Sequence, residues 1–161
     1  MNAKILIVDD DPDIVTMLED RLEATDYGTV VARDGVQAVE QVEQEVPHLV
    51  LLDLDMPRLN GIEVLKRLGR LKQADDVPVI VMTAHGSIQA AVDVMKEGAY
   101  DFLTKPLDKD HLLIVIRKAL ERNSLKRQLA CLKSEVDSRY ASIVGTGARI
   151  RTVMDAAQRA A

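Results

Sequence analysis

The sequence lacks most of the features that cross-link a protein or hold it in a membrane. A single cysteine, Cys131, leaves no disulfide possible within the 161 residues. Tryptophan is absent and aromatic residues make up only 2%, so the core must be aliphatic. No run reaches the roughly 18 apolar residues of a membrane helix, and acids follow the first apolar run directly, unlike in a signal peptide. With a net charge of -5, which disfavours a nucleic-acid-binding surface, we expect a cytoplasmic protein without membrane contact.

What the chain does contain is a repeated alternation of short apolar runs with helical spacing. Each run is followed by apolar residues three and four positions apart, and Asp11, Asn60 and Ser87 are placed to cap helices. This alternation predicts an α/β fold, a doubly wound, five-stranded parallel sheet with helices on both faces. Right-handed crossovers then bring all the strand ends to one edge. The predicted strands are 4–8, 28–32, 49–52, 77–82 and 100–104.

The chain is organised around the stretch LVLLDLDMPRLNG, residues 49–61. Its uninterrupted apolar run predicts a strand that is buried on both faces. Asp53 and Asp55 fall where the strand ends, and Pro57 and Gly61 turn the chain away. Ligand sites collect at this edge of parallel sheets. We therefore predict that Asp53 is a chemical group presented at the rim of the sheet.

Other strand ends should bring polar groups to the same edge. Several carboxylates facing one another form a hard-oxygen site suited to Mg²⁺. An aspartate beside such a metal can act as a nucleophile toward phosphorus, and Lys105 and Thr83 can contact the transferred oxygens. Each residue alone is a weak signal, and only their conjunction indicates phosphoryl chemistry. The residues expected at this edge are Asp9, Asp10, Asp53, Asp55, Thr83 and Lys105.

These motifs together resemble the receiver domains of bacterial response regulators. The resemblance lies in IVDDD after the first strand, DLDMPxxxG after the third, Thr-Ala after the fourth and Lys-Pro after the fifth. It covers a receiver domain at residues 1–122 and implies the flavodoxin-like strand order 2-1-3-4-5. It also implies that Asp53 accepts a phosphoryl group from a sensor histidine kinase, that Thr83 and Lys105 contact that group, and that Mg²⁺ is held by Asp9, Asp10, Asp53 and the main-chain carbonyl of Met56.

The same resemblance implies a switch. Thr83 moving toward the phosphoryl group would vacate space for Phe102, which stands at an aromatic switch position. Phe102 has no hydroxyl group, so we expect switching by burial of its ring. Asp55 and His85 occupy flanking positions that tune the lifetime of the acyl phosphate in the family, without indicating the direction of the effect here.

The last predicted helix is too long for this fold. Leu125, Leu129, Leu132 and Val136 form a stripe with steps of four and three. Extended backward, the stripe reaches Val115 through Arg122 and Lys118, which gives a heptad seam. We predict a coiled-coil linker at residues 123–139 that joins two copies in a homodimer. The alternative is a charged linker that is helical only in part.

Residues 140–161 change in character again. A glycine-containing turn at 145–147 is expected to lead into another helix. This segment resembles the start of the AAA+ ATPase domain of NtrC-like, sigma-54-dependent activators. The chain holds no G-x-x-x-x-G-K-[ST] loop, so it is not itself an ATPase. We expect no enzyme activity beyond phosphorylation and dephosphorylation of Asp53, and contact with nucleic acid only through a DNA-binding domain elsewhere.

Two other classes share parts of this pattern. DLDMP is similar to the D-x-D-x-T signature of haloacid-dehalogenase-type phosphatases, but those enzymes place the metal-binding acid pair after the nucleophile, whereas Asp9 and Asp10 precede it here. A flavin-binding module would need a first loop rich in Ser, Thr and Gly, and three aspartates stand there instead.

Overall fold

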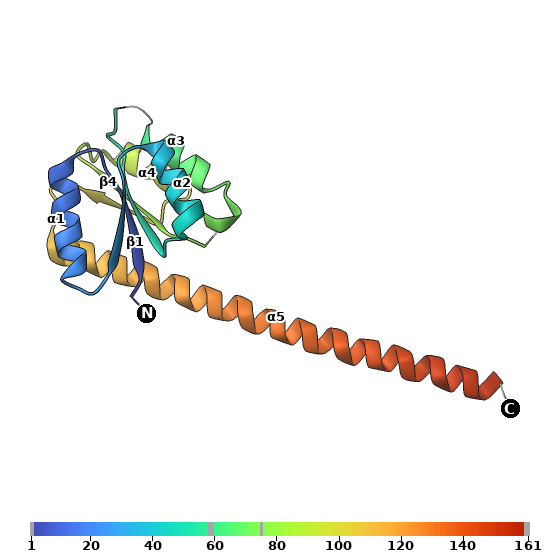
Figure 1. The fold of residues 1–161 in the computed structure, drawn as a ribbon. Coiled ribbons are helices and arrows are strands. Elements are labelled where there is room, and N and C mark those ends of the chain that lie inside the picture. Colours follow the sequence, from blue (N-terminus) through green and yellow to red (C-terminus); the bar gives the residue numbers. More distant parts are fainter. Residues whose placement is uncertain (1, 58–59, 75, 160–161) are drawn as a thin grey trace. The chain divides into compact units, whose positions relative to one another are not determined.

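The fold was analysed in a computed structural model that describes residues 2–57, 60–74 and 76–159, with only the backbone at residues 73 and 145–159. Contacts divide the chain into two compact units, Met1–Asn123 and Ser124–Ala161. The first unit is a parallel sheet with helices on both faces (Figure 1). Within the described residues, no helix is both long and apolar enough to cross a bilayer.

The sheet has five parallel strands in the order β2-β1-β3-β4-β5. This confirms the predicted fold and strand order. The sheet's registers set Asp53 beside Met82, and Thr83 beside Thr104, so the carboxyl ends of β3, β4 and β5 lie at one edge. The strands are β1 Lys4–Val8, β2 Gly28–Ala32, β3 Leu49–Asp53, β4 Val79–Thr83 and β5 Asp101–Thr104.

Successive side chains of a strand point to opposite faces, and this splits the core into two layers. In β1, Ile5 and Ile7 pack in the layer with α1 and the start of α5, whereas Leu6 and Val8 pack in the layer with α2 and α3. Both layers are aliphatic, as the shortage of aromatic residues requires. The helices are α1 Pro12–Glu23, α2 Gly35–Glu45, α3 Gly61–Leu68, α4 Ile88–Lys96 and α5 Lys109–Arg159, with a short 3-10 helix, η1, at Lys72–Ala74.

The predicted caps lie at the starts of helices. Asp11 accepts a hydrogen bond from the Asp13 N–H, Asn60 from Ile62, and Ser87 from Ala90. Each cap pairs a backbone N–H that the first turn of a helix cannot satisfy internally. The capping residues thus end the loops that leave β1, β3 and β4, and those loops carry the polar residues of the sheet edge.

Three expectations from the sequence are wrong. Strand β4 begins at Val79 rather than Val77, because Pro78 has no N–H for the ladder. Helix α5 continues through residues 145–147, where a turn was expected. Glycine costs about 1 kcal/mol relative to alanine inside a helix, which lowers helix stability without forcing a break.

The third correction concerns Val115, which was assigned to the dimer seam. Val115 is only 5% exposed and packs in the core of the first unit with Leu112, Ile116 and Ala119. These residues recur at helical spacing and form the buried stripe of α5. A side chain that already covers the sheet has no surface left for a second copy, so the seam cannot extend back to Val115.

Gly61 gives a stability prediction. A Cβ atom there would lie 2.6 Å from the Asp53 carbonyl oxygen and 2.7 Å from the Leu54 Cα, so the backbone after β3 would have to move. We expect Gly61→Ala to lower the free energy of unfolding by about 1–3 kcal/mol. Gly69→Ala is the matched control, since a Cβ there meets nothing closer than 3.5 Å. Urea denaturation of both variants measures the difference, and equal effects would contradict this account.

Candidate acidic phosphoacceptor site

Three aspartates meet at the carboxyl edge of the sheet. Asp53 ends β3, and Asp9 and Asp10 follow the neighbouring strand β1. One carboxylate oxygen from each lies within 4.8 Å of the others. Asp9 is fully buried, Asp53 is 2% exposed and Asp10 is exposed to solvent. The cluster combines buried carboxylates with one that is open to water, and this donor set fits Mg²⁺, which usually keeps several of its waters.

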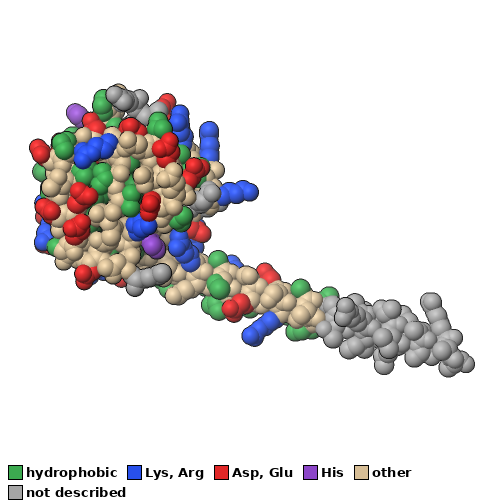
Figure 2. All heavy atoms as spheres, in the orientation of Figure 1, with side chains coloured by type: hydrophobic (Ala, Val, Ile, Leu, Met, Phe, Trp, Pro, Cys, Tyr) green, Lys and Arg blue, Asp and Glu red, His purple; other side chains and the backbone are tan. Residues whose placement is uncertain are grey.

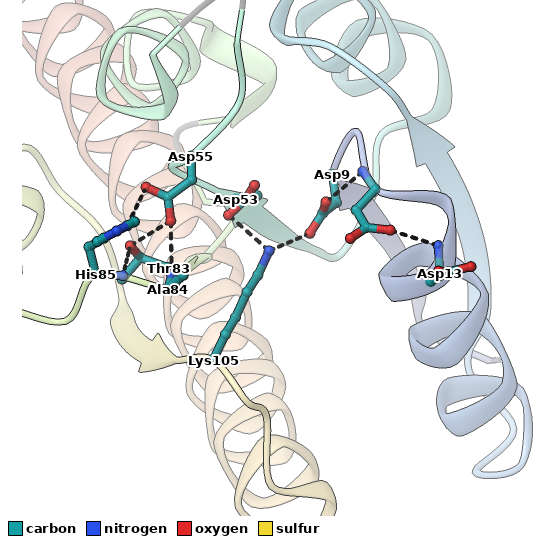
Figure 3. Close-up of polar contacts among 9 residues, drawn as sticks. Asp9, Asp13, Asp53, Asp55, Thr83, Ala84, His85 and Lys105 are labelled. Carbon is teal, nitrogen blue, oxygen red and sulfur yellow. Dashed lines mark hydrogen bonds and ion pairs between the residues drawn. The ribbon is translucent and has the colours of Figure 1, made fainter.

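Lys105 places one positive charge between two of these carboxylates. Its Nζ lies 2.9 Å from Asp9 Oδ2 and 3.1 Å from Asp53 Oδ1 (Figure 3). The lysine side chain is only 15% exposed. Its backbone N–H donates to the Thr83 carbonyl at 2.8 Å, which fixes the loop after β5 to the end of β4. The predicted grouping of Lys105 with the acids is therefore present.

The electrostatics of this group follow from burial and like charge. Burial, and then the neighbouring Asp9 carboxylate, raise the pKa of Asp53, although Lys105 and the Asp55 backbone N–H act in the opposite direction. Burial tends to lower the pKa of Lys105, but its bonds to Asp9 and Asp53 outweigh that effect and raise it. Lys105 is therefore held as a cation beside an aspartate whose ionised form is disfavoured.

Asp55 contacts the loop between β4 and α4. Its Oδ2 accepts from the Thr83 hydroxyl at 3.0 Å and from the Ala84 N–H at 2.8 Å. Its Oδ1 lies 3.5 Å from the His85 Nδ1. The backbone N–H of His85 donates to the Thr83 hydroxyl oxygen at 3.0 Å (Figure 3). Burial works to raise the pKa of Asp55, but the Ala84 N–H, the Thr83 hydroxyl and His85 outweigh it and lower this pKa.

The structure thus assigns a partner to Asp55 that the sequence did not reveal. Sequence reasoning treated Asp55 and His85 only as neighbours of the reacting group. Thr83 lies at the expected edge, but its hydroxyl is bonded to Asp55. The spacing of these residues carries no signal for this contact, because it depends on how two separate loops fold toward each other.

Two other predicted site residues lie partly or wholly in the core. The Met56 side chain is buried, and Phe102 is half-buried against the layer that contains α2 and α3. The role predicted for the Met56 carbonyl remains a prediction.

The remaining predicted seam residues lie in the second unit, on α5. Leu125, Leu129, Leu132 and Val136 are 61%, 60%, 58% and 54% exposed. Figure 2 shows hydrophobic side chains emerging along the described part of this helix. An apolar stripe of this kind, exposed at heptad spacing, is typical of a helix that pairs with another.

Comparisons with known proteins match this arrangement. Residues 5–117 match the model of the response regulator receiver domain. The chain is 44% identical to the transcriptional regulatory protein ZraR of Escherichia coli K12, over 74% of this chain and 26% of ZraR. It is 40% identical to the nitrogen assimilation regulatory protein NtrX of Azorhizobium caulinodans, over 83% of this chain and 29% of NtrX. The chain therefore spans about a quarter to a third of these relatives.

Solved structures show the same fold. The receiver domain of a LuxO repressor protein from Vibrio parahaemolyticus superposes with a TM-score of 0.75 at 29% identity, covering 80% of this chain and 98% of that one. NtrX from Brucella abortus gives 0.74 at 36% identity, covering 82% of this chain and 30% of NtrX. The phosphatase alternative finds no support in these matches. The match of residues 5–117, together with the shared fold, shows that the chain belongs to the response regulator receiver domain family.

Proposed function

We propose that Asp53 accepts a phosphoryl group from a sensor histidine kinase. The observation that carries this proposal is the position of the Asp53 carboxylate, which lies with Asp9 and Asp10 on one side and has Lys105 Nζ at 3.1 Å. A carboxylate oxygen of Asp53 attacks phosphorus, the new O–P bond forms, and the P–N bond of the phosphohistidine breaks. The electron pair of that bond returns to the imidazole nitrogen.

Lys105 and Thr83 contribute by their placement. The lysine ammonium is fixed before the reaction, because Asp9 and Asp53 both hold it, and it faces the negative charge that develops on the transferred oxygens. Thr83 ends the neighbouring strand and supplies a hydroxyl donor. We propose that its movement toward the phosphoryl group changes the packing of Phe102 and so switches the domain between two populated states.

Asp9, Asp10 and Asp53 are the residues that would hold Mg²⁺. The bound cation would neutralise part of their charge and let an anionic phosphoryl donor approach. A main-chain carbonyl after Asp53 would complete the protein ligands. Met56 is the residue predicted to supply it.

We further propose that this receiver controls a transcription activator. The relatives ZraR and NtrX are named as regulatory proteins and are three to four times as long as the region that they share with this chain. The structure of NtrX from Brucella abortus was obtained with bound ADP, which fits an ATP-binding domain in that protein. By analogy, we assign 1–122 to the receiver, 123–139 to the linker and 140–161 to the start of an AAA+ domain of a cytoplasmic, sigma-54-dependent activator.

The exposed stripe of α5 supports a homodimer. Removing a leucine side chain from water contributes roughly 1.5–3 kcal/mol. Four such side chains in phase on one helix favour pairing with a second copy, since an identical helix supplies the matching stripe. We propose that Leu125, Leu129, Leu132 and Val136 form this contact.

Replacement of Asp53 tests the phosphoacceptor. We expect Asp53→Asn to abolish the incorporation of phosphate from acetyl phosphate with Mg²⁺, because an amide oxygen is too weak a nucleophile, and EDTA to abolish incorporation into the wild type. Intact-mass spectrometry measures the product. Asp34→Asn, which changes another aspartate that follows a strand at this edge, should be labelled normally. Labelling of Asp53→Asn would refute the assignment.

The raised pKa of Asp53 predicts a pH effect on stability. The folded, metal-free protein holds the Asp53 proton more tightly than the unfolded chain does, where the value is 3.8, so ionisation of Asp53 lowers stability as the pH rises through the raised pKa. Asp53→Asn does not lose stability in this way, because asparagine does not ionise. Urea denaturation in EDTA should therefore show that the advantage of the variant over wild type grows as the pH rises above about 4. Mg²⁺ should shrink this advantage at pH 7, and an advantage that is independent of pH would contradict the account.

Substitutions in the stripe test the dimer. Leu129→Lys with Leu132→Lys should shift the mass in sedimentation equilibrium toward monomer, because charges would replace apolar contacts. Ala130→Lys with Ser134→Lys is the matched control, as it adds the same charge on the opposite face of the exposed helix. A monomeric wild type, or equal effects of the two pairs, would disprove the proposed seam.

A further inference from the structure

The Asp55 carboxylate lies outside the acidic cluster, yet it takes up donors at the same edge of the sheet. Its Oδ2 alone accepts from the Thr83 hydroxyl and the Ala84 N–H, at 3.0 and 2.8 Å. Thr83 is only 2% exposed, so water does not replace Asp55 easily as a partner. These two bonds fix the start of the loop between β4 and α4.

A phosphoryl group on Asp53 would need such donors. It brings three strong acceptor oxygens and a charge of about -2. In the part of the chain that the structure describes, Lys105 already divides its Nζ between Asp9 and Asp53. The Thr83 hydroxyl and the Ala84 N–H lie at the end of the strand beside β3 and are both bonded to Asp55. The phosphoryl group can therefore gain these two donors only by taking them from Asp55.

The charges act in the same direction. Asp55 follows Asp53 by two residues, and its carboxylate is bonded to Thr83 on the strand beside the one that Asp53 ends. Adding negative charge to Asp53 repels the Asp55 carboxylate, although solvent screens part of this repulsion because the Asp55 side chain is 38% exposed. Phosphorylation would then weaken the contacts that the phosphoryl oxygens must replace.

The loop between β4 and α4, which Asp55 holds, also contacts β5, the strand that contains Phe102. A Cβ atom at Gly86 would clash with the Thr104 Cγ2 and would lie 3.8 Å from the Phe102 ring. The loop that begins at Thr83 is thus packed directly on β5. Its release from Asp55 would change the surroundings of Phe102 without any direct contact between Phe102 and Asp53.

We infer that Asp55 is a positioning residue, whose carboxylate holds Thr83 and Ala84 in the unphosphorylated protein and competes with the phosphoryl group for both donors. This inference rests on the proposed function of Asp53. Asp55 would therefore oppose phosphorylation of Asp53, because the free energy of phosphorylation would include the cost of breaking two hydrogen bonds. The Asp55 carboxylate acts through Thr83 and Ala84 and not on the reacting atoms.

The first measurement reads the contact without any phosphoryl group. Hydrogen exchange by NMR should show that the Ala84 amide exchanges about tenfold faster in Asp55→Ala, since its acceptor has gone. Asp34→Ala is the matched control. Asp34 follows β2 at the same edge and also accepts two backbone N–H groups, from Val36 and Gln37, but β2 is separated from β4 by two strands of the sheet. Unchanged exchange at Ala84 in Asp55→Ala would overturn the inference.

The second measurement reads the competition at equilibrium. Beryllofluoride with Mg²⁺ stands in for the phosphoryl group and does not hydrolyse, so an effect on acyl-phosphate lifetime cannot enter. We expect Asp55→Ala to bind it about tenfold more tightly than wild type, as two competing hydrogen bonds are lost. Asp55→Asn keeps an acceptor oxygen without the charge and should fall in between, and it serves as the test if Asp55→Ala does not fold.

The outcomes separate the two proposals. Equal or weaker binding by both Asp55 variants, with normal binding by wild type and Asp34→Ala, would overturn the competition. Failure of the wild type itself to bind beryllofluoride would instead count against the proposed function of Asp53, and the exchange of the Ala84 amide would still decide whether Asp55 holds the loop.

Discussion

The structure around the site depends on one half-buried cation, Lys105, shared between two carboxylates. Asp53 at the end of β3 and Asp9 just after β1 are both buried, and their charges repel. The Lys105 Nζ lies 2.9 and 3.1 Å from the two carboxylates, while burial and the Asp9 charge still raise the pKa of Asp53. Under the proposed function, bound Mg²⁺ would relieve part of the repulsion between these buried charges. The two aliphatic layers stabilise the fold around them.

The parallel sheet brings residues that are far apart in the sequence close together at one edge. Asp53 ends β3, Asp9 directly follows β1 and Lys105 directly follows β5, and none of the three would be placed at this edge without these parallel strands. The aliphatic side chains on the two faces of the sheet form the core, and this core keeps the strand ends in place at the edge that carries the site. The helix caps end the loops, and the close approach of Gly61 to the backbone of Asp53 and Leu54 holds the start of α3 against the end of β3.

Most of the fold and the centre of the site could be predicted from the sequence. Uninterrupted apolar runs, caps and the order of strands and helices are local signals, and they suffice to bring Asp9, Asp10, Asp53 and Lys105 together. Two kinds of feature could not be predicted. The hydrogen bonds of Asp55 depend on the shape of two loops, and Val115 satisfied a heptad pattern and a core pattern at once. Tertiary packing decided in favour of the core, because Val115 packs with the side chains that cover the sheet in the same chain.

The position of Asp55 has a consequence for how such a switch can evolve. Aspartate and asparagine codons differ by one base, so a single mutation can change the charge that faces Thr83 while every residue of the acidic cluster stays the same. Under the proposed competition, the equilibrium between the two states of the domain can change while the residues that carry out phosphoryl transfer stay the same. Lineages could then adjust how readily the domain responds to a given kinase, and populations could carry that variation, without passing through an inactive protein.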